Sequence, residues 1–112
     1  MVASTLYAQT LSSLTATRAA MLDPTWIAAQ QGQSPETRFQ ASQALIQVQQ
    51  AISSLSTASL DDIAEKMMAQ EQAIQTATSN LTASLEDLTK VQNVLNAVSS
   101  VISLVAKVSP LL

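Results

Sequence analysis

Residues that favour turns are scarce in this chain. Its 112 residues include one glycine, Gly32, and only three prolines. Folds built from short β-strands need frequent turns, and those turns rely on glycine, proline and their polar neighbours. Apolar side chains recur instead at spacings of three and four residues, which place them on one face of a helix. The sequence therefore predicts an all-α fold, organised as a single helical domain over residues 1–112.

Two proline-containing segments divide the first half of the chain. Asp23-Pro24 and Ser34-Pro35 each combine a good helix N-cap with proline at the first helical position. They predict helices over residues 3–22, 24–31 and 35–57, the second being a short connector whose Trp26 is expected to cover one end of the bundle. The buried stripe expected on the third helix consists of Leu45, Val48, Ile52 and Leu55, preceded by Phe39.

From Leu60 onward, apolar side chains recur in alternating steps of three and four, as in the heptads of a coiled coil. Only Gln70 and Ser84 interrupt this series before Val105. The pattern predicts one helix over residues 60–107, with a break near 78–84 as the alternative. The predicted architecture is thus an elongated antiparallel helical bundle of three main helices and a short connector helix, with a long heptad-patterned C-terminal helix.

A short acidic phrase occurs twice, as ASLDDIAEK at residues 58–66 and as ASLEDLTK at residues 83–90. Serine followed by acids resembles a helix start, because acids in the first turn meet the positive end of the helix dipole. The first copy therefore predicts a helix start at Leu60. At the second copy, burial of seam residues at ~1.5–3 kcal/mol each outweighs a cap of about 1 kcal/mol, which favours an unbroken helix. Neither arrangement brings the two acid pairs together as one metal site.

The composition removes most routes to catalysis. The chain has no cysteine and no histidine, so thiol chemistry, the commonest general base and the commonest transition-metal ligand are all absent. A phosphate-binding loop needs several glycines, and Gly32 stands alone. We expect no enzyme and no catalytic, cofactor-binding or metal site. The chain is acidic, with a net charge of −3, and its five basic residues are scattered, which argues against nucleic acid as a partner.

Location within the cell stays open at this point. The N-terminal segment MVASTLYAQTLSS lacks the basic start and the apolar run of a signal peptide, and no run of 18 or more apolar residues predicts a membrane span. The bacterial cytoplasm and signal-independent secretion both fit. The bias towards Ser, Thr, Gln and Ala is similar to that of subunits of secreted helical filaments, a likeness of composition alone.

The C-terminal segment has the broadest apolar surface. Residues 91–106 carry no charge, and their apolar side chains cover about half of a helix. On a long C-terminal helix, the two shorter helices could not cover this face, and a monomer would expose a larger apolar patch than soluble monomers tolerate. The sequence therefore predicts a homo-oligomer, or a complex with a helical protein partner. The predicted interface consists of Leu88, Val91, Val94, Leu95, Val98, Val101, Ile102, Leu104, Val105 and Val108. The alternative is an amphipathic protein that binds a membrane or another hydrophobic surface.

Overall fold

The computed structural model describes residues 2–109, and every regular element in that range is a helix. This confirms the predicted all-α fold. The molecule is compact, with a Cα radius of gyration of 13.9 Å and extents of 43 × 24 × 18 Å. Its helices are α1 (Ala3–Met21), α2 (Pro24–Gln31), α3 (Pro35–Thr57), α4 (Leu60–Ala69), α5 (Glu71–Ser84) and α6 (Val91–Val108).

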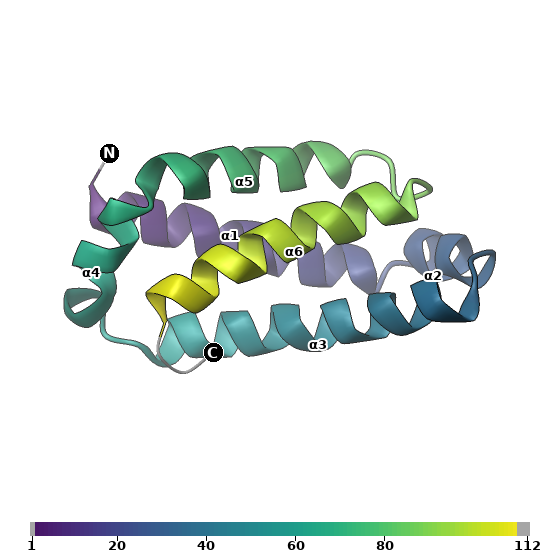
Figure 1. Cartoon of the computed structure of the whole chain (residues 1–112), viewed down its shortest axis with the longest axis horizontal. Helices are drawn as coiled ribbons and strands as arrows, with labels where there is room; N and C mark the ends of the chain where they lie inside the picture. The colour runs from purple at the N-terminus through teal and green to yellow at the C-terminus, as the bar shows by residue number, and fades with distance from the viewer. Residues whose placement is uncertain (1, 110–112) are drawn as a thin grey trace.

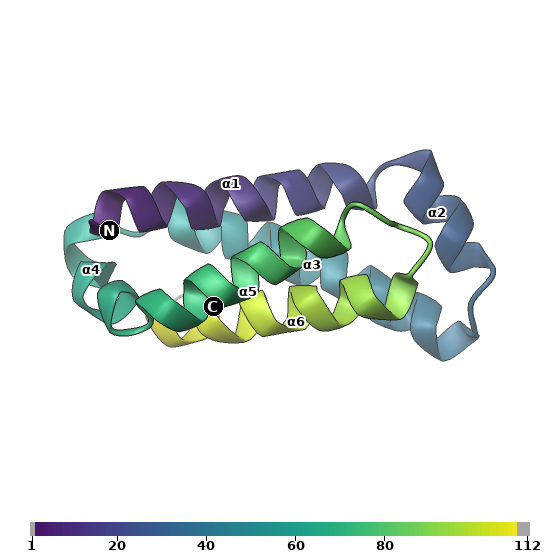
Figure 2. The same cartoon turned by 90° about the horizontal axis from the view of Figure 1, so that it is seen from above.

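Four helices lie side by side along the long axis, and the two short ones close opposite ends (Figures 1 and 2). Helix α3 packs against α1 and α6, and α5 packs against α6 and, less extensively, against α1. The long helices therefore form a ring in the order α1, α3, α6, α5. Helices α1 and α5 run from the α4 end to the α2 end, and α3 and α6 run back (Figure 1).

The helix starts in the first half follow from short-range chemistry. A carboxylate oxygen of Asp23 accepts a hydrogen bond from the backbone N–H of Thr25 at 2.8 Å, and the Ser34 hydroxyl accepts one from the N–H of Thr37 at 3.2 Å. Proline follows each cap at the first helical position. The bounds of α1, α2 and α3 consequently agree within one residue with the helices predicted over 3–22, 24–31 and 35–57.

The single helix predicted over residues 60–107 is wrong, because three helices occupy that range. The first interruption is at Gln70, whose φ of −109° and ψ of 16° depart from helical geometry. The second is a loop at residues 85–90, just beyond the segment considered as the alternative break. A carboxylate oxygen of Asp87 accepts hydrogen bonds there from the backbone N–H and the hydroxyl of Thr89. The second acidic phrase is thus a helix end and a loop.

The loop at residues 85–90 turns α6 back along α5, so that the apolar face of α6 packs against both α5 and α3. A straight helix would have carried that face beyond the reach of the other helices. Burial of a valine or leucine contributes about 1.5–3 kcal/mol, so covering seven side chains outweighs the backbone hydrogen bonds lost at one break. The burial gained by folding α6 back on α5 and α3 therefore decides the break, and a comparison of the helix cap with the continuous apolar seam does not include this burial.

The core is aliphatic, and several hydroxyl groups along it find partners in the backbone. On α1, Thr10 and Thr17 are fully buried, and their hydroxyls donate to the carbonyls of Leu6 and Ser13, both at 2.8 Å. The hydroxyl of Tyr7 donates to the Leu55 carbonyl at 2.6 Å and joins the start of α1 to the end of α3.

The expectation that Trp26 covers one end of the bundle holds, and a pair of hydroxyls connects the last helix to α3. Trp26 is buried beneath α2, where that helix meets α1, α3 and α6, and Met67 is buried in α4. The buried hydroxyls of Ser54 and Ser109 bond to each other and connect the ends of α3 and α6.

Candidate interaction surface

The ten residues predicted as an interface lie in or against the core of this single chain. Among them Val94 is fully buried, and Val98 is 1% exposed. Leu88, Ile102 and Leu104 are half-buried and pack on the core from its edge. The remaining members, all buried, are Val91, Leu95, Val101, Val105 and Val108.

The premise of the predicted interface was therefore wrong. It assumed a long C-terminal helix with a distal half that no other helix could reach. Since the chain breaks at residues 85–90, α6 lies among α3, α4 and α5, and these helices cover its broad apolar face. Of the ten residues, Leu88, Ile102 and Leu104 keep part of their side chains exposed at the surface of the bundle.

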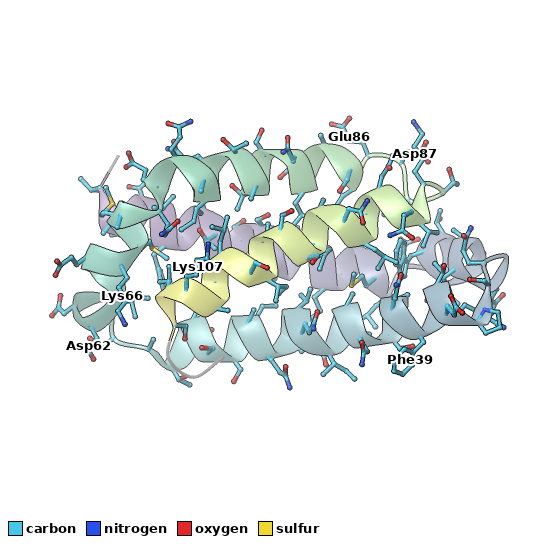
Figure 3. The ribbon with its side chains drawn as sticks, in the orientation of Figure 1. Phe39, Asp62, Lys66, Glu86, Asp87 and Lys107 are labelled. Atoms are coloured by element: carbon cyan, nitrogen blue, oxygen red, sulfur yellow. The ribbon has the colours of Figure 1, made fainter. Side chains whose placement is uncertain are left out.

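The described residues offer no arrangement typical of a metal centre. Across residues 2–109, no three or more acidic side chains are grouped so that they could hold a metal ion. The two acid pairs of the repeated phrase lie far apart, since Asp62 is at the α4 end and Glu86 and Asp87 are at the other end (Figure 3). The hydrogen bonds from the side chain and the backbone N–H of Thr89 hold the pKa of Asp87 below its ordinary value. This pKa shift belongs to a turn and involves no partner carboxylate.

The charges of the whole chain gather at the two ends of the bundle. Three basic and four acidic residues lie at the α2 end, and two basic and four acidic residues lie at the α4 end; Figure 3 labels several of them. The first group is Arg18, Asp23, Glu36, Arg38, Glu86, Asp87 and Lys90. The second group is Asp61, Asp62, Glu65, Lys66, Glu71 and Lys107.

The middle of the bundle is free of charge. The spans without any charged residue are 2–17, 39–60, 72–85 and 91–106, one on each long helix. The ring arrangement brings these four spans side by side and produces a belt of Ser, Thr, Gln, Asn and Ala around the molecule. We call this surface the neutral belt.

Large apolar side chains break the polar surface of the neutral belt on α3. Phe39 is 63% exposed and Ile46 is 53% exposed. Phe39 extends away from the bundle (Figure 3), so its place in the predicted buried stripe was wrong. The reason is helical phase: Phe39 precedes the buried Val48 by nine residues, which at 100° per residue puts it on the opposite side of the helix.

The exposed residues of α3 form a continuous stripe along its outer face. Their spacing alternates between four and three residues, and every member is solvent-exposed. We call it the α3 stripe; it comprises Phe39, Gln43, Ile46, Gln50, Ser53 and Thr57. A sequence reading of the charge-free run after Arg38 could have found it by assigning helical phase to each apolar residue.

Open grooves lie between helices of the ring: one of about 340 Å³ lies between α5 and α6, and two others lie on further sides. One of these two, of about 240 Å³, runs between α3 and α6 and is lined largely by amides, among them Gln40, Gln47 and Asn96. The other, of about 920 Å³, runs between α1 and α5, where Ser12 and Thr78 are typical of its small polar lining. The largest of these grooves coincides with the side of the ring where helix packing is least extensive.

Helix α6 has a property that the sequence prediction did not foresee. It is the one helix in the described part of the chain that is long and apolar enough to cross a membrane, judged by length and composition only. Core helices of soluble proteins meet the same criterion, and the valines of α6 are in the core here.

Comparison with known proteins adds no relative to this description. No protein-family model, no curated protein and no solved structure matches the chain significantly. Function is therefore inferred from the surface of the bundle itself.

Proposed function

We propose that this protein is a non-enzymatic helical module that assembles with its own copies or with a helical protein partner through the sides of the bundle. The observation that supports the proposal is the neutral belt. All thirteen charged residues lie at the ends, and the long sides carry none over the spans defined above. Self-association is retained from the sequence prediction, and its location is moved from α6 to the exterior.

Burying a charged surface in an interface is costly. The cores of protein interfaces are depleted in lysine, aspartate and glutamate, because such groups must be desolvated and paired. Long charged side chains also lose rotamer freedom when a partner covers them. The neutral belt avoids the desolvation of charge along its length, and its Ser, Thr and Ala side chains lose less rotamer freedom than lysine or glutamate would. The charged ends stay in water and keep the chain soluble.

Sedimentation equilibrium over a wide range of protein concentration tests the proposal. We expect a defined assembly that forms as concentration rises. The control is Asp61→Ala, which alters a charge at the α4 end and should leave the assembly intact. A chain that stays monomeric at its highest soluble concentration, and that cross-links to no other protein in its native cells, would reject the proposal.

A second function, binding to a membrane or another hydrophobic surface, is favoured by the composition of α6 alone. Its apolar face is in the core, so the bundle would have to open before α6 could enter lipid. Flotation with anionic and with neutral liposomes, combined with hydrogen exchange of the α6 amides, tests this. Co-flotation together with loss of protection in α6 would favour the membrane function over assembly of the closed bundle.

A further inference from the structure

We propose that two copies of the chain pair through the α3 stripe, with their α3 helices antiparallel. This inference rests on the proposed function, and it names the surface and geometry by which self-association occurs. Large exposed apolar side chains elsewhere lie near the ends: Val2 precedes α1, and Leu22 and Ile27 lie at the α2 end. Among the described residues of the four long helices, the large exposed apolar side chains are Phe39 and Ile46, both in the α3 stripe.

The spacing of the stripe suits pairing with itself. Phe39 and Ile46 are separated by two helical turns. In an antiparallel pair with its two-fold axis between Ser42 and Gln43, Phe39 of each copy lies opposite Ile46 of the other. Gln43 then lies beside the axis, where the two copies of its amide can hydrogen bond to each other. Such a contact uses the same patch on both copies and closes at a dimer.

The charges that flank the stripe select the antiparallel direction. Glu36 and Arg38 are the charged residues of α3. Parallel pairing in register would set each of them beside its own copy, and like charges repel. With the axis between residues 42 and 43, Glu36 lies opposite Gln49 and Arg38 lies opposite Gln47, so both meet neutral amides. The antiparallel pair therefore desolvates no like-charged pair.

The size of the molecule requires a contact along its side. Each end of the bundle measures 24 × 18 Å, about 430 Å², whereas a long side is 43 Å in length. A standard interface buries about 800 Å² on each partner. The proposed axis lies about 3.5 residues from the middle of α3, which shifts the copies by about 10 Å and leaves an overlap of about 33 Å. With a width of 18 to 24 Å, the overlapping sides measure about 600–800 Å², which is the upper limit of the area that each copy can bury. We therefore expect a dimer whose fraction depends on concentration.

A matched pair of charge-introducing variants tests the surface. Ile46→Lys places a charge in the centre of the contact, and Thr76→Lys places the same charge on α5, diagonally across the ring from α3. Both positions are exposed, so both variants should keep the circular dichroism spectrum and unfolding midpoint of the parent protein. In sedimentation equilibrium, Ile46→Lys should raise the dimer dissociation constant at least tenfold, and Thr76→Lys should leave it within twofold.

Single cysteines test the direction of pairing, because the natural chain has none. A disulfide needs Cα atoms within about 7 Å. Mild oxidation should therefore link two copies of Gln43→Cys much faster than two copies of Phe39→Cys, which the antiparallel pair separates by about two helical turns. Equal linking at both positions would overturn the antiparallel geometry.

The outcomes separate this inference from the proposed function. An oligomer that responds equally to Ile46→Lys and Thr76→Lys keeps the function and rejects the α3 stripe. A chain that is monomeric at every concentration rejects the α3 dimer outright, and cross-linking in native cells then decides whether a different protein partner sustains the proposed function.

Discussion

Truncation of Val98 to alanine distinguishes a core helix from an interface helix. Val98 is 1% exposed and belongs to the buried face of α6. The substitution removes two methyl groups, worth about 1.6 kcal/mol at ~0.8 kcal/mol each, and the residual cavity adds up to about 1 kcal/mol. Alanine is the better helix former by about 0.5 kcal/mol, which offsets part of this loss. We expect the free energy of unfolding to fall by about 1–2 kcal/mol.

Urea unfolding followed by far-ultraviolet circular dichroism measures this loss, and it should be run at two protein concentrations tenfold apart. For a chain of this length the melting temperature should fall by about 4–9 °C. The matched control is Ser99→Ala, an exposed neighbour on α6, which should stay within about 0.5 kcal/mol of the parent. The loss at Val98 should be the same at both concentrations, because the side chain packs within its own chain.

The result that would refute this reasoning is equally specific. If Val98→Ala unfolded with the stability of the parent while the average mass in sedimentation fell, Val98 would lie between chains. The originally predicted interface on α6 would then be restored, and the packing of α6 against α3 and α5 described above would be incorrect.

Three further expectations concern the loop, the buried hydroxyls and the capped end. The hydrogen bonds from Thr89 lower the pKa of Asp87. The contribution of Asp87 to stability is therefore present above the unfolded-state pKa and is lost as pH falls through the folded-state pKa, below about pH 4. Thr89→Val should raise the pKa of Asp87 in an NMR titration, and an unchanged value would show that Thr89 is not the cause. Ser54→Ala leaves the Ser109 hydroxyl buried without its partner and should lower the free energy of unfolding by about 1–3 kcal/mol. Replacing both serines by alanine should recover much of that loss in urea unfolding, and additive losses would argue against the pair. Trp26→Ala should cost about 3–5 kcal/mol by the same assay because this side chain is 2% exposed, and a loss below 1 kcal/mol would mean that it does not support the α2 end.

Helix phase shows how far residue spacing carries a prediction. Val48 and Leu55 were placed correctly in the core, because steps of seven residues keep one face of a helix. Phe39 was placed wrongly although the same arithmetic, applied over nine residues, turns it outwards. The α3 stripe could therefore be read from the sequence once Val48 was taken as buried. Residue spacing alone gives no reason to take Val48, and not Phe39, as the residue that faces the core.

The break at residues 85–90 shows where the sequence was insufficient. Its own residues are ambiguous, since the acidic phrase fits a helix start and the apolar seam fits a continuous helix. The deciding energy comes from α6 packing on α3, which is distant in sequence. No short stretch of sequence centred on residues 85–90 contains the residues of α3 that stabilise this break.

The sequence by itself determined the helical class, the capped starts of α2 and α3 and the absence of cysteine and histidine, because these depend on residue type and on neighbours within one turn. It also contained every charge-free span. Only the tertiary structure decided that those spans lie side by side as one neutral belt and that the valines of α6 face inwards. Both outcomes depend on how the chain turns back on itself, and the free energy of that turn comes from contacts between helices that are remote along the chain.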